Sequence, residues 1–162
     1  MNLTRLFDMQ ETLDRKIEEQ HHLGNEELIE KKTLALLVEL GELANETRCF
    51  KFWSLKPASD PSVILEEYVD GIHFILSLGI ELKLQNHVKV ERLIIDTALT
   101  EQFLAVYTAI DQFKQDYSKL RYLILFNEYI NLGEQLGFTT EQIEEAYMKK
   151  NQVNHERQEQ GY

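Results

Sequence analysis

Thr33-Leu-Ala-Leu-Leu-Val-Glu-Leu, residues 33–40, is the most informative stretch of this sequence for the fold. Apart from Thr33 and Glu39, every residue in it is apolar, and it lies within a longer segment, Glu26–Cys49, that contains no proline. Because apolar side chains surround such a helix almost completely, we predict a helix that is buried on more than one side. Glu39 is the exception, since an unpaired carboxylate is costly to bury among apolar neighbours.

The rest of the chain favours more helices of the same kind. Of its 162 residues, 43% are hydrophobic, and only 7 are Gly and 2 are Pro, which excludes a many-turned β-sandwich and a disordered chain. Apolar residues at helical spacing predict five further helices. The first covers Thr4–Gln20, and the second is capped by Ser62 and contains Leu65–Gly79. The others cover Val88–Gln115, with Ile95 in the core stripe, the segment from Leu120 to Gly133 or Gly137, and the segment from Thr139 onward. We therefore predict a single all-α domain over residues 1–162, a bundle of five or six helices with a four-helix core.

Charge and cysteine content limit the partners and the compartment. Lys and Arg number 17 against 28 Asp and Glu, which gives a net charge of −11 at pH 7 and disfavours nucleic-acid binding. The lone Cys49 excludes an internal disulfide framework and a cysteine zinc site, and it fits a reducing cytoplasm. Apolar runs are far shorter than the ~20 residues of a membrane span, so we expect a cytoplasmic protein without membrane partners.

Two acidic pairs are the main candidates for chemistry. Glu39 and Glu42 form one pair, and Glu67 and Asp70 form the other. A spacing of three residues places both carboxylates of a pair on one helix face. If the two helices are antiparallel and joined by the loop around residues 57–61, the four carboxylates converge, and they need a counter-cation. An all-oxygen cluster favours Mg²⁺ or Mn²⁺, so the four-helix core would carry a metal site.

The same acids have two other interpretations. Acid pairs at this spacing are common on solvated helix faces, where they form surface ion pairs. A di-iron site would need Glu-x-x-His motifs from two helices, and only Asp70-Gly-Ile-His73 approaches that pattern. Glu39 lies in the apolar run and Asp70 lies near Phe74 on an apolar stripe, which favours the oxygen-ligand site over both alternatives.

Two motifs and the C-terminal segment resemble one enzyme family. Glu-Leu-Gly-Glu-Leu-Ala-Asn-Glu-Thr-Arg-Cys-Phe-Lys-Phe-Trp (39–53) and Glu-Glu-Tyr-Val-Asp-Gly-Ile-His-Phe (66–74) are similar to motifs of the dimeric all-α dUTPases. Tyr147-Met-Lys-Lys-Asn-Gln-Val-Asn-His-Glu-Arg-Gln (147–158) narrows the match to that branch of the all-α nucleoside triphosphate pyrophosphohydrolases, which also include MazG-type enzymes. The resemblance extends from Gln10 to Gln158.

The resemblance implies a reaction and an assembly. It implies Mg²⁺-dependent hydrolysis of dUTP, and of dUDP, to dUMP, which keeps uracil out of DNA. Glu39, Glu42, Glu67 and Asp70 would hold the metal, and metal-activated water would attack the phosphate chain with Glu39, then Glu42, as the candidate base. It also implies a homodimer whose sites are completed by the second subunit.

Further residues become candidates for substrate binding through the same resemblance. The Gln10 amide matches a uracil edge, Trp53 and Phe74 could flank the base or the deoxyribose, and His73, next to Phe74 in sequence, is a further candidate. Phosphate contacts are assigned to Arg48, Lys51, Lys56, Lys150, Asn151, Asn154 and Arg157, with Arg48 and Lys51 reaching across the dimer. From the residues alone, Gln10, His73 and Phe74 are also compatible with helix packing, and the last helix with a frayed polar terminus.

Two alternative functions remain open from sequence. One is a MazG-type pyrophosphohydrolase that acts on another nucleotide, such as dCTP. The other is a non-catalytic helical interaction protein that has kept an ancestral nucleotide fold.

Overall fold

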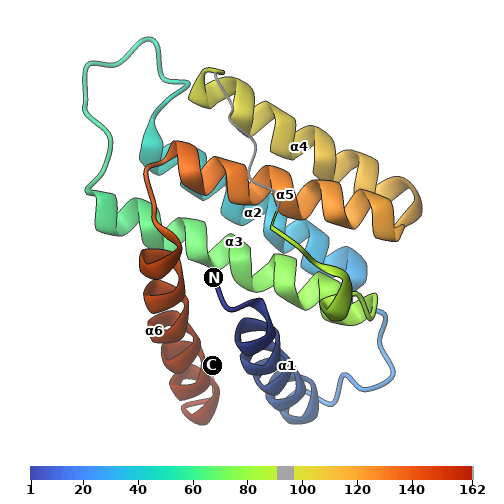
Figure 1. Ribbon diagram of the computed structural model, residues 1–162. Helices are drawn as coiled ribbons and strands as arrows, with labels where there is room; N and C mark the ends of the chain where they lie inside the picture. The colour runs from blue at the N-terminus through green and yellow to red at the C-terminus, as the bar shows by residue number, and fades with distance from the viewer. Residues whose placement is uncertain (91–96, 162) are drawn as a thin grey trace.

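The computed structural model describes residues 1–90 and 97–161, and these residues are helical throughout their regular structure (Figure 1). The helices are α1 (Leu3–Gln20), α2 (Ile29–Thr47), α3 (Pro61–Glu81), the short 3₁₀-helix η1 (Gln85–His87), α4 (Leu99–Asp116), α5 (Lys119–Gln135) and α6 (Thr140–Glu159). The all-α prediction is confirmed. Within the described ranges, each helix is too short or too polar to cross a lipid bilayer.

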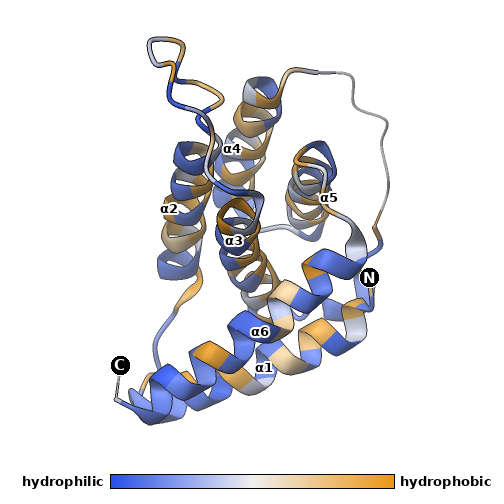
Figure 2. Cartoon of the chain, turned by 90° about the vertical axis from the view of Figure 1, so that its left-hand side faces the viewer, coloured by the Kyte–Doolittle hydropathy of each residue, from blue (hydrophilic) through white to orange (hydrophobic). Residues whose placement is uncertain are grey.

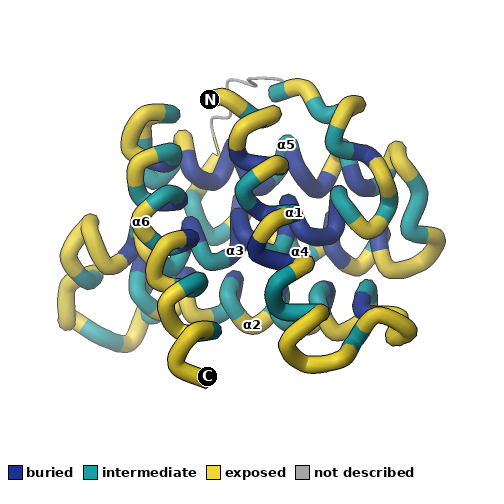
Figure 3. The backbone as a smooth tube through the Cα atoms, turned by 90° about the horizontal axis from the view of Figure 1, so that it is seen from below, coloured by how far each residue is buried: buried dark blue, intermediate teal, exposed yellow. Residues whose placement is uncertain are grey.

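Helix α3 is the centre of the arrangement. Helices α2 to α5 lie together as a four-helix bundle, while α1 and α6 lie side by side across α3 (Figures 1 and 2). Because α3 contacts α1, α2, α5 and α6, it is buried from several directions, and its long apolar stretch requires that burial. Figure 3 shows buried residues concentrated along α3 and α5, with exposed residues on the outer sides of α2 and α6.

Helix α2 is less buried than its apolar sequence predicts. Leu36 and Leu40 are fully buried, but Leu34 is 63% and Val38 is 50% exposed. Helix α2 packs on α3 and α4 and lies at the edge of the bundle, so nothing in the described chain covers its outer side. The prediction of a helix buried on more than one side is therefore wrong for a single copy of this chain.

Two predicted helix starts are also wrong. The cap of α3 is Asp60, whose carboxylate accepts the Ser62 N–H at 2.9 Å, because Pro61 already occupies the first helical position. Helix α4 begins at Leu99, and residues 88–90 are not helical. Ile95, placed in the core stripe of this helix, lies outside the described residues.

In α5 the predicted core stripe of Leu120, Leu123, Phe126 and Ile130 is confirmed only in part. Phe126 and Ile130 are buried, whereas Leu120 is 67% exposed, and Tyr122 and Tyr129 also lie on the buried face. The start of the last helix is confirmed, since Thr139 caps α6 by accepting the Gln142 N–H.

Tyrosine hydroxyls set the close packing of α3 against α5. The hydroxyl of Tyr129 donates to the Tyr68 carbonyl at 2.9 Å, and that of Tyr68 donates to the Tyr129 carbonyl at 3.2 Å. Each hydroxyl lies against a glycine of the facing helix, Gly71 on α3 and Gly133 on α5. A Cβ atom at Gly71 would lie only 1.9 Å from the Tyr129 hydroxyl, so this close approach requires glycine.

We expect Gly71→Ala to lower the free energy of unfolding by about 2 kcal/mol, because the added methyl group forces α3 and α5 apart. Gly41→Ala is the matched control, since its Cβ would lie 3.5 Å from the Tyr107 hydroxyl, an ordinary contact. This control should be neutral or stabilising by up to ~1 kcal/mol through helix propensity. Urea denaturation followed by circular dichroism measures both, and equal stabilities would contradict the packing argument.

Candidate active site

Three carboxylates from α2 and α3 meet at one place. Oxygen atoms of Glu39, Glu67 and Asp70 lie within 4.8 Å of one another, and all three residues are half-buried. The two helices are joined by the loop around residues 48–60 and run antiparallel, as the acid spacing requires (Figure 1). Glu42, one turn further along α2, is exposed and lies outside this cluster.

The cluster carries more negative charge than its surroundings neutralise. Burial, together with the charges of Asp70, Glu42 and Glu67, raises the pKa of the Glu39 carboxyl to about 7, although Lys150 opposes the shift. Burial also raises the pKa values of Glu67 and Asp70. Carboxylate oxygens this close fit a hard divalent cation such as Mg²⁺ or Mn²⁺, which would relieve the repulsion.

Lys150 of α6 is the cation next to these acids. Its Nζ lies 2.7 Å from Asp70 Oδ2 and 2.9 Å from Glu66 Oε1. Burial disfavours the ammonium, but the hydrogen bonds to these two carboxylates outweigh it and raise the pKa of Lys150. The pair of bonds ties α6 to α3 beside the acidic cluster.

A cavity of about 410 Å³ extends from the acids between α1, α3 and α6. Its lining comes from α1 (Gln10, Leu13, Asp14, Ile17 and Glu18), from the start and middle of α2 (Leu28, Lys32 and Glu39), from α3 (Asp70, His73, Phe74 and Ser77) and from α6 (Lys150, Asn154 and Arg157). Asp70, Phe74 and Ser77 are on successive turns of α3, so the cavity follows that helix away from the acids.

A buried hydrogen-bond network joins residues of α1, α3 and α6 beside this cavity. Gln10 Oε1 lies 2.8 Å from Tyr147 Oη and 2.8 Å from His73 Nδ1, and Gln10 Nε2 donates to Asp14 Oδ1 at 2.7 Å. The His73 ring stacks on Tyr147 with 4.2 Å between centroids. Burial, with the nearby charge of Lys150, lowers the pKa of His73 to about 3, so the imidazole is neutral.

Sequence reasoning missed several members of this site. Asp14 and Ser77 were not identified, although Ser77 donates to Asp14 Oδ2 at 2.5 Å. A signal was present in the spacing, because Asp14 follows Gln10 by four residues and Ser77 follows His73 by four, on the same helix faces. Tyr147 and Lys32 carried no comparable local signal.

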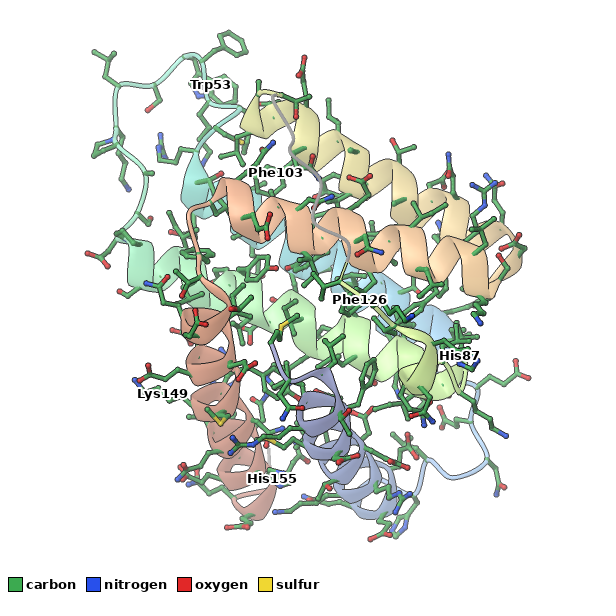
Figure 4. All side chains as sticks on the ribbon, viewed as in Figure 1. Trp53, His87, Phe103, Phe126, Lys149 and His155 are labelled. Carbon is green, nitrogen blue, oxygen red and sulfur yellow. The ribbon has the colours of Figure 1, made fainter. Side chains whose placement is uncertain are left out.

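Two predicted substrate residues lie away from the cavity lining. Trp53 is 64% exposed in the loop between α2 and α3, where it contacts the rings of Phe50 and Phe52. Figure 4 shows Trp53 near the top of the view and His155 of α6 near the bottom. Asn151 is buried on α6, one turn after Tyr147, and does not line the cavity.

The predicted cations of the same loop interact with the loop itself. The Arg48 guanidinium donates to the Lys56 carbonyl at 3.0 Å and to Ser54 Oγ at 2.6 Å. The ammonium of Lys51 donates to Asn45 Oδ1, and the side chain of Lys56 is exposed. None of these three cations lines the cavity of its own chain.

A family model described as dUTPase matches residues 2–162. The chain belongs to the dUTPase family. The match covers nearly the whole chain, so the resemblance drawn from the motifs is confirmed, and dUTP diphosphatase activity with dUTP as substrate follows from it. No curated protein matches the sequence. In this dUTPase, the acidic cluster and the cavity beside it are the candidate active site.

The raised pKa of Glu39 predicts how the stability of the metal-free dUTPase depends on pH. The folded state holds this proton up to about pH 7, whereas the ordinary pKa is 4.5, so unfolding releases a proton between these values. This contribution makes stability fall as pH rises through that window. In EDTA, the melting temperature of Glu39→Gln relative to wild type should therefore rise from pH 5 to pH 7.5.

Glu30→Gln is the control, because Glu30 is an exposed acid on the same helix. Its melting temperature relative to wild type should be independent of pH over this range. Parallel curves for wild type and Glu39→Gln would show that Glu39 has an ordinary pKa.

Proposed function

We propose that this dUTPase hydrolyses dUTP to dUMP and pyrophosphate in a Mg²⁺-dependent reaction, and that it also accepts dUDP. The observation that carries the proposal is the cluster of Glu39, Glu67 and Asp70 at one end of a cavity of about 410 Å³. That volume is in the range of small-molecule sites, ~300–1,000 Å³. It supports a site that binds a nucleotide with its phosphates at the acids.

Glu39, Glu67 and Asp70 are the residues that would hold Mg²⁺, or Mn²⁺ in its place, with Glu42 as the next carboxylate on the same face of α2. When bound, the metal neutralises phosphate charge and lowers the pKa of water. Glu39 is the preferred general base, because it is half-buried and its pKa is matched to proton transfer near neutral pH. Glu42 is the second candidate.

The order of residues along α3 supports one orientation of the nucleotide. Seven residues separate Asp70 from Ser77, which is roughly 10 Å along a helix. Phosphates at Asp70 then place the sugar near Phe74 and His73 and the base near Ser77 and Asp14. Leu13, Ile17 and Leu28 supply apolar contacts to the base, and Gln10 keeps one amide hydrogen that no described residue accepts.

Helix α6 supplies donors for the phosphates. Lys150, Asn154 and Arg157 are spaced by four and three residues and all line the cavity. Lys150 now bonds Asp70 and Glu66, and a triphosphate offers it a stronger anionic partner. Asn151 would support this contact from within α6, beside Tyr147.

We also propose that the enzyme is a homodimer whose sites are completed across the interface. Leu34 and Val38 are exposed on one side of α2, and Leu104 is 60% exposed on α4, the helix that packs beside it. A second copy that covers this face would explain why α2 is apolar all round. Arg48, Lys51, Lys56 and Trp53, which do not line their own cavity, would then contact the partner's substrate. We expect the enzyme to act in the cytoplasm.

Release of the nucleoside monophosphate from a panel of nucleotides tests the proposed reaction, with pyrophosphate as the second product from dUTP and inorganic phosphate from dUDP. We expect Mg²⁺-dependent turnover of dUTP and dUDP. Turnover of dCTP should be at least ~100-fold slower, because cytosine presents different hydrogen-bonding groups from uracil, and turnover of dTTP should also be slower, because its additional methyl group must fit the same pocket. Glu39→Gln and Glu67→Gln should each lower kcat by at least ~100-fold, whereas Glu30→Gln should retain wild-type turnover. Faster turnover of dCTP than of dUTP would favour the MazG-type alternative instead.

Light scattering on size-exclusion fractions tests the dimer. We expect a dimeric wild type, a monomeric Leu34→Glu variant, and a dimeric Leu120→Glu variant, because Leu120 is equally exposed but lies on α5. Mixing inactive Glu67→Gln subunits with Arg48→Met subunits should restore activity, since a mixed dimer contains one intact site. A monomeric wild type, or no restoration, would contradict shared sites.

A further inference from the structure

We propose that Asp14 is a positioning residue that acts through Gln10 to fix the tautomer of His73, so that His73 Nε2, buried beside the cavity, can act only as a hydrogen-bond acceptor. The ligand group that fits this acceptor is an N–H or O–H donor of the nucleoside, either the 3′-hydroxyl or the imide N–H of the base. Only the identity of the ligand rests on the proposed function, because the tautomer is a property of the protein alone.

Asp14 is buried, with 7% of its surface exposed. Its carboxyl group is approached by Gln10 Nε2 at 2.7 Å, Ser77 Oγ at 2.5 Å and Lys32 Nζ at 3.7 Å. Burial raises the pKa of Asp14, but the charge of Lys32 and the two hydrogen bonds oppose that shift. Since every polar neighbour named here is a donor, the site is built for a carboxylate.

A carboxylate can only accept hydrogen bonds, and this sets the orientation of the Gln10 amide. The amide nitrogen must face Asp14, so the amide oxygen faces the other way, toward Tyr147 and His73. A flipped amide would place two acceptors against each other at Asp14. The Gln10 oxygen is therefore fixed as an acceptor 2.8 Å from His73 Nδ1.

An amide oxygen cannot donate, so the proton of the His73–Gln10 hydrogen bond is on Nδ1. His73 is neutral, and its Nε2 must then carry a lone pair. This Nε2 is buried, and it has no hydrogen-bond partner among the described residues. Stacking on Tyr147 holds the ring in place, and His73 borders the cavity.

Burying a hydrogen-bond acceptor without a partner costs free energy, and a ligand that donates a hydrogen bond to this acceptor removes that cost. The cavity should therefore favour a nucleoside that carries a donor at this position. An analogue without it should bind about 10- to 100-fold more weakly, the range found when a buried polar group is left unpaired.

Nitrogen-15 NMR of the ligand-free protein at pH 7 tests the tautomer directly. In wild type we expect His73 as the Nδ1–H tautomer, opposite to the form that predominates in free histidine. Asp14→Asn lets the Gln10 amide take either orientation, so Nε2–H signal should appear for His73. Gln10→Met, which removes the intermediate residue, should give the same change and serves if Asp14→Asn does not fold.

Ser77→Ala is the matched control, because it removes a different donor to the same carboxylate and leaves the bond between Asp14 and Gln10. Its His73 tautomer should remain Nδ1–H. The proposal is overturned if wild-type His73 carries its proton on Nε2, or if the tautomer is unchanged in both Asp14→Asn and Gln10→Met. None of these spectra depends on hydrolysis, so a failure of this proposal can be distinguished from a failure of the proposed function.

Kinetics with two analogues identify the ligand donor. One analogue is the 2′,3′-dideoxy nucleotide, which lacks the 3′-hydroxyl, and the other is N3-methyl-dUTP, which lacks the imide N–H. The analogue that lacks the donor should show a KM about tenfold above that of dUTP, and this difference should shrink in Asp14→Asn. Asp14→Asn itself should raise KM about tenfold for dUTP with kcat within about twofold. Equal KM values for all three nucleotides would overturn the assignment of a ligand to Nε2.

Discussion

Mutual repulsion among three half-buried carboxylates is the constraint on which the rest of this structure depends. Glu39, Glu67 and Asp70 bring their oxygens within 4.8 Å, and burial and neighbouring charges both favour their protonated forms. Left to themselves, α2 and α3 would turn these faces apart. The fold must hold them together by contacts elsewhere, and Lys150 supplies part of the opposing charge.

Those contacts are on the opposite side of α3. Tyr129 lies against Gly71, next to Asp70, and Tyr122 lies against Gly79, two turns further along, where its hydroxyl donates to the Ile75 carbonyl at 3.0 Å. Large side chains seated against glycines fix both the distance and the rotation of α3 relative to α5. Because these contacts prevent rotation of α3, Asp70 must face α2 even though its charge is repelled there.

The sequence allowed prediction of features that depend on one helix or on neighbouring helices. The convergence of Glu39 with Glu67 and Asp70 and the cap at Thr139 are of this kind, because spacing of three or four residues has a direct geometric meaning, although Glu42 lies outside the cluster. The exposure of one side of α2 and of Leu120 on α5 could not be predicted from the sequence. Apolar residues have the same spacing on a face that packs in the core and on a face that another copy covers. The partner of Gln10 was also hidden, because Tyr147 is 137 residues away in sequence.

The two ends of the cavity solve different physical problems. At the acidic end, the half-buried carboxylates carry excess negative charge, which a cation can balance. At the other end, Asp14, Gln10 and His73 are joined by hydrogen bonds, and His73 Nε2 is left without a partner among the described residues. Helix α6 reaches both ends, through Lys150 at the acids and through Tyr147 beside His73. Because α6 carries both residues, a shift of α6 that releases Lys150 would also move the Tyr147 ring that stacks on His73, so the two ends of the cavity are mechanically coupled.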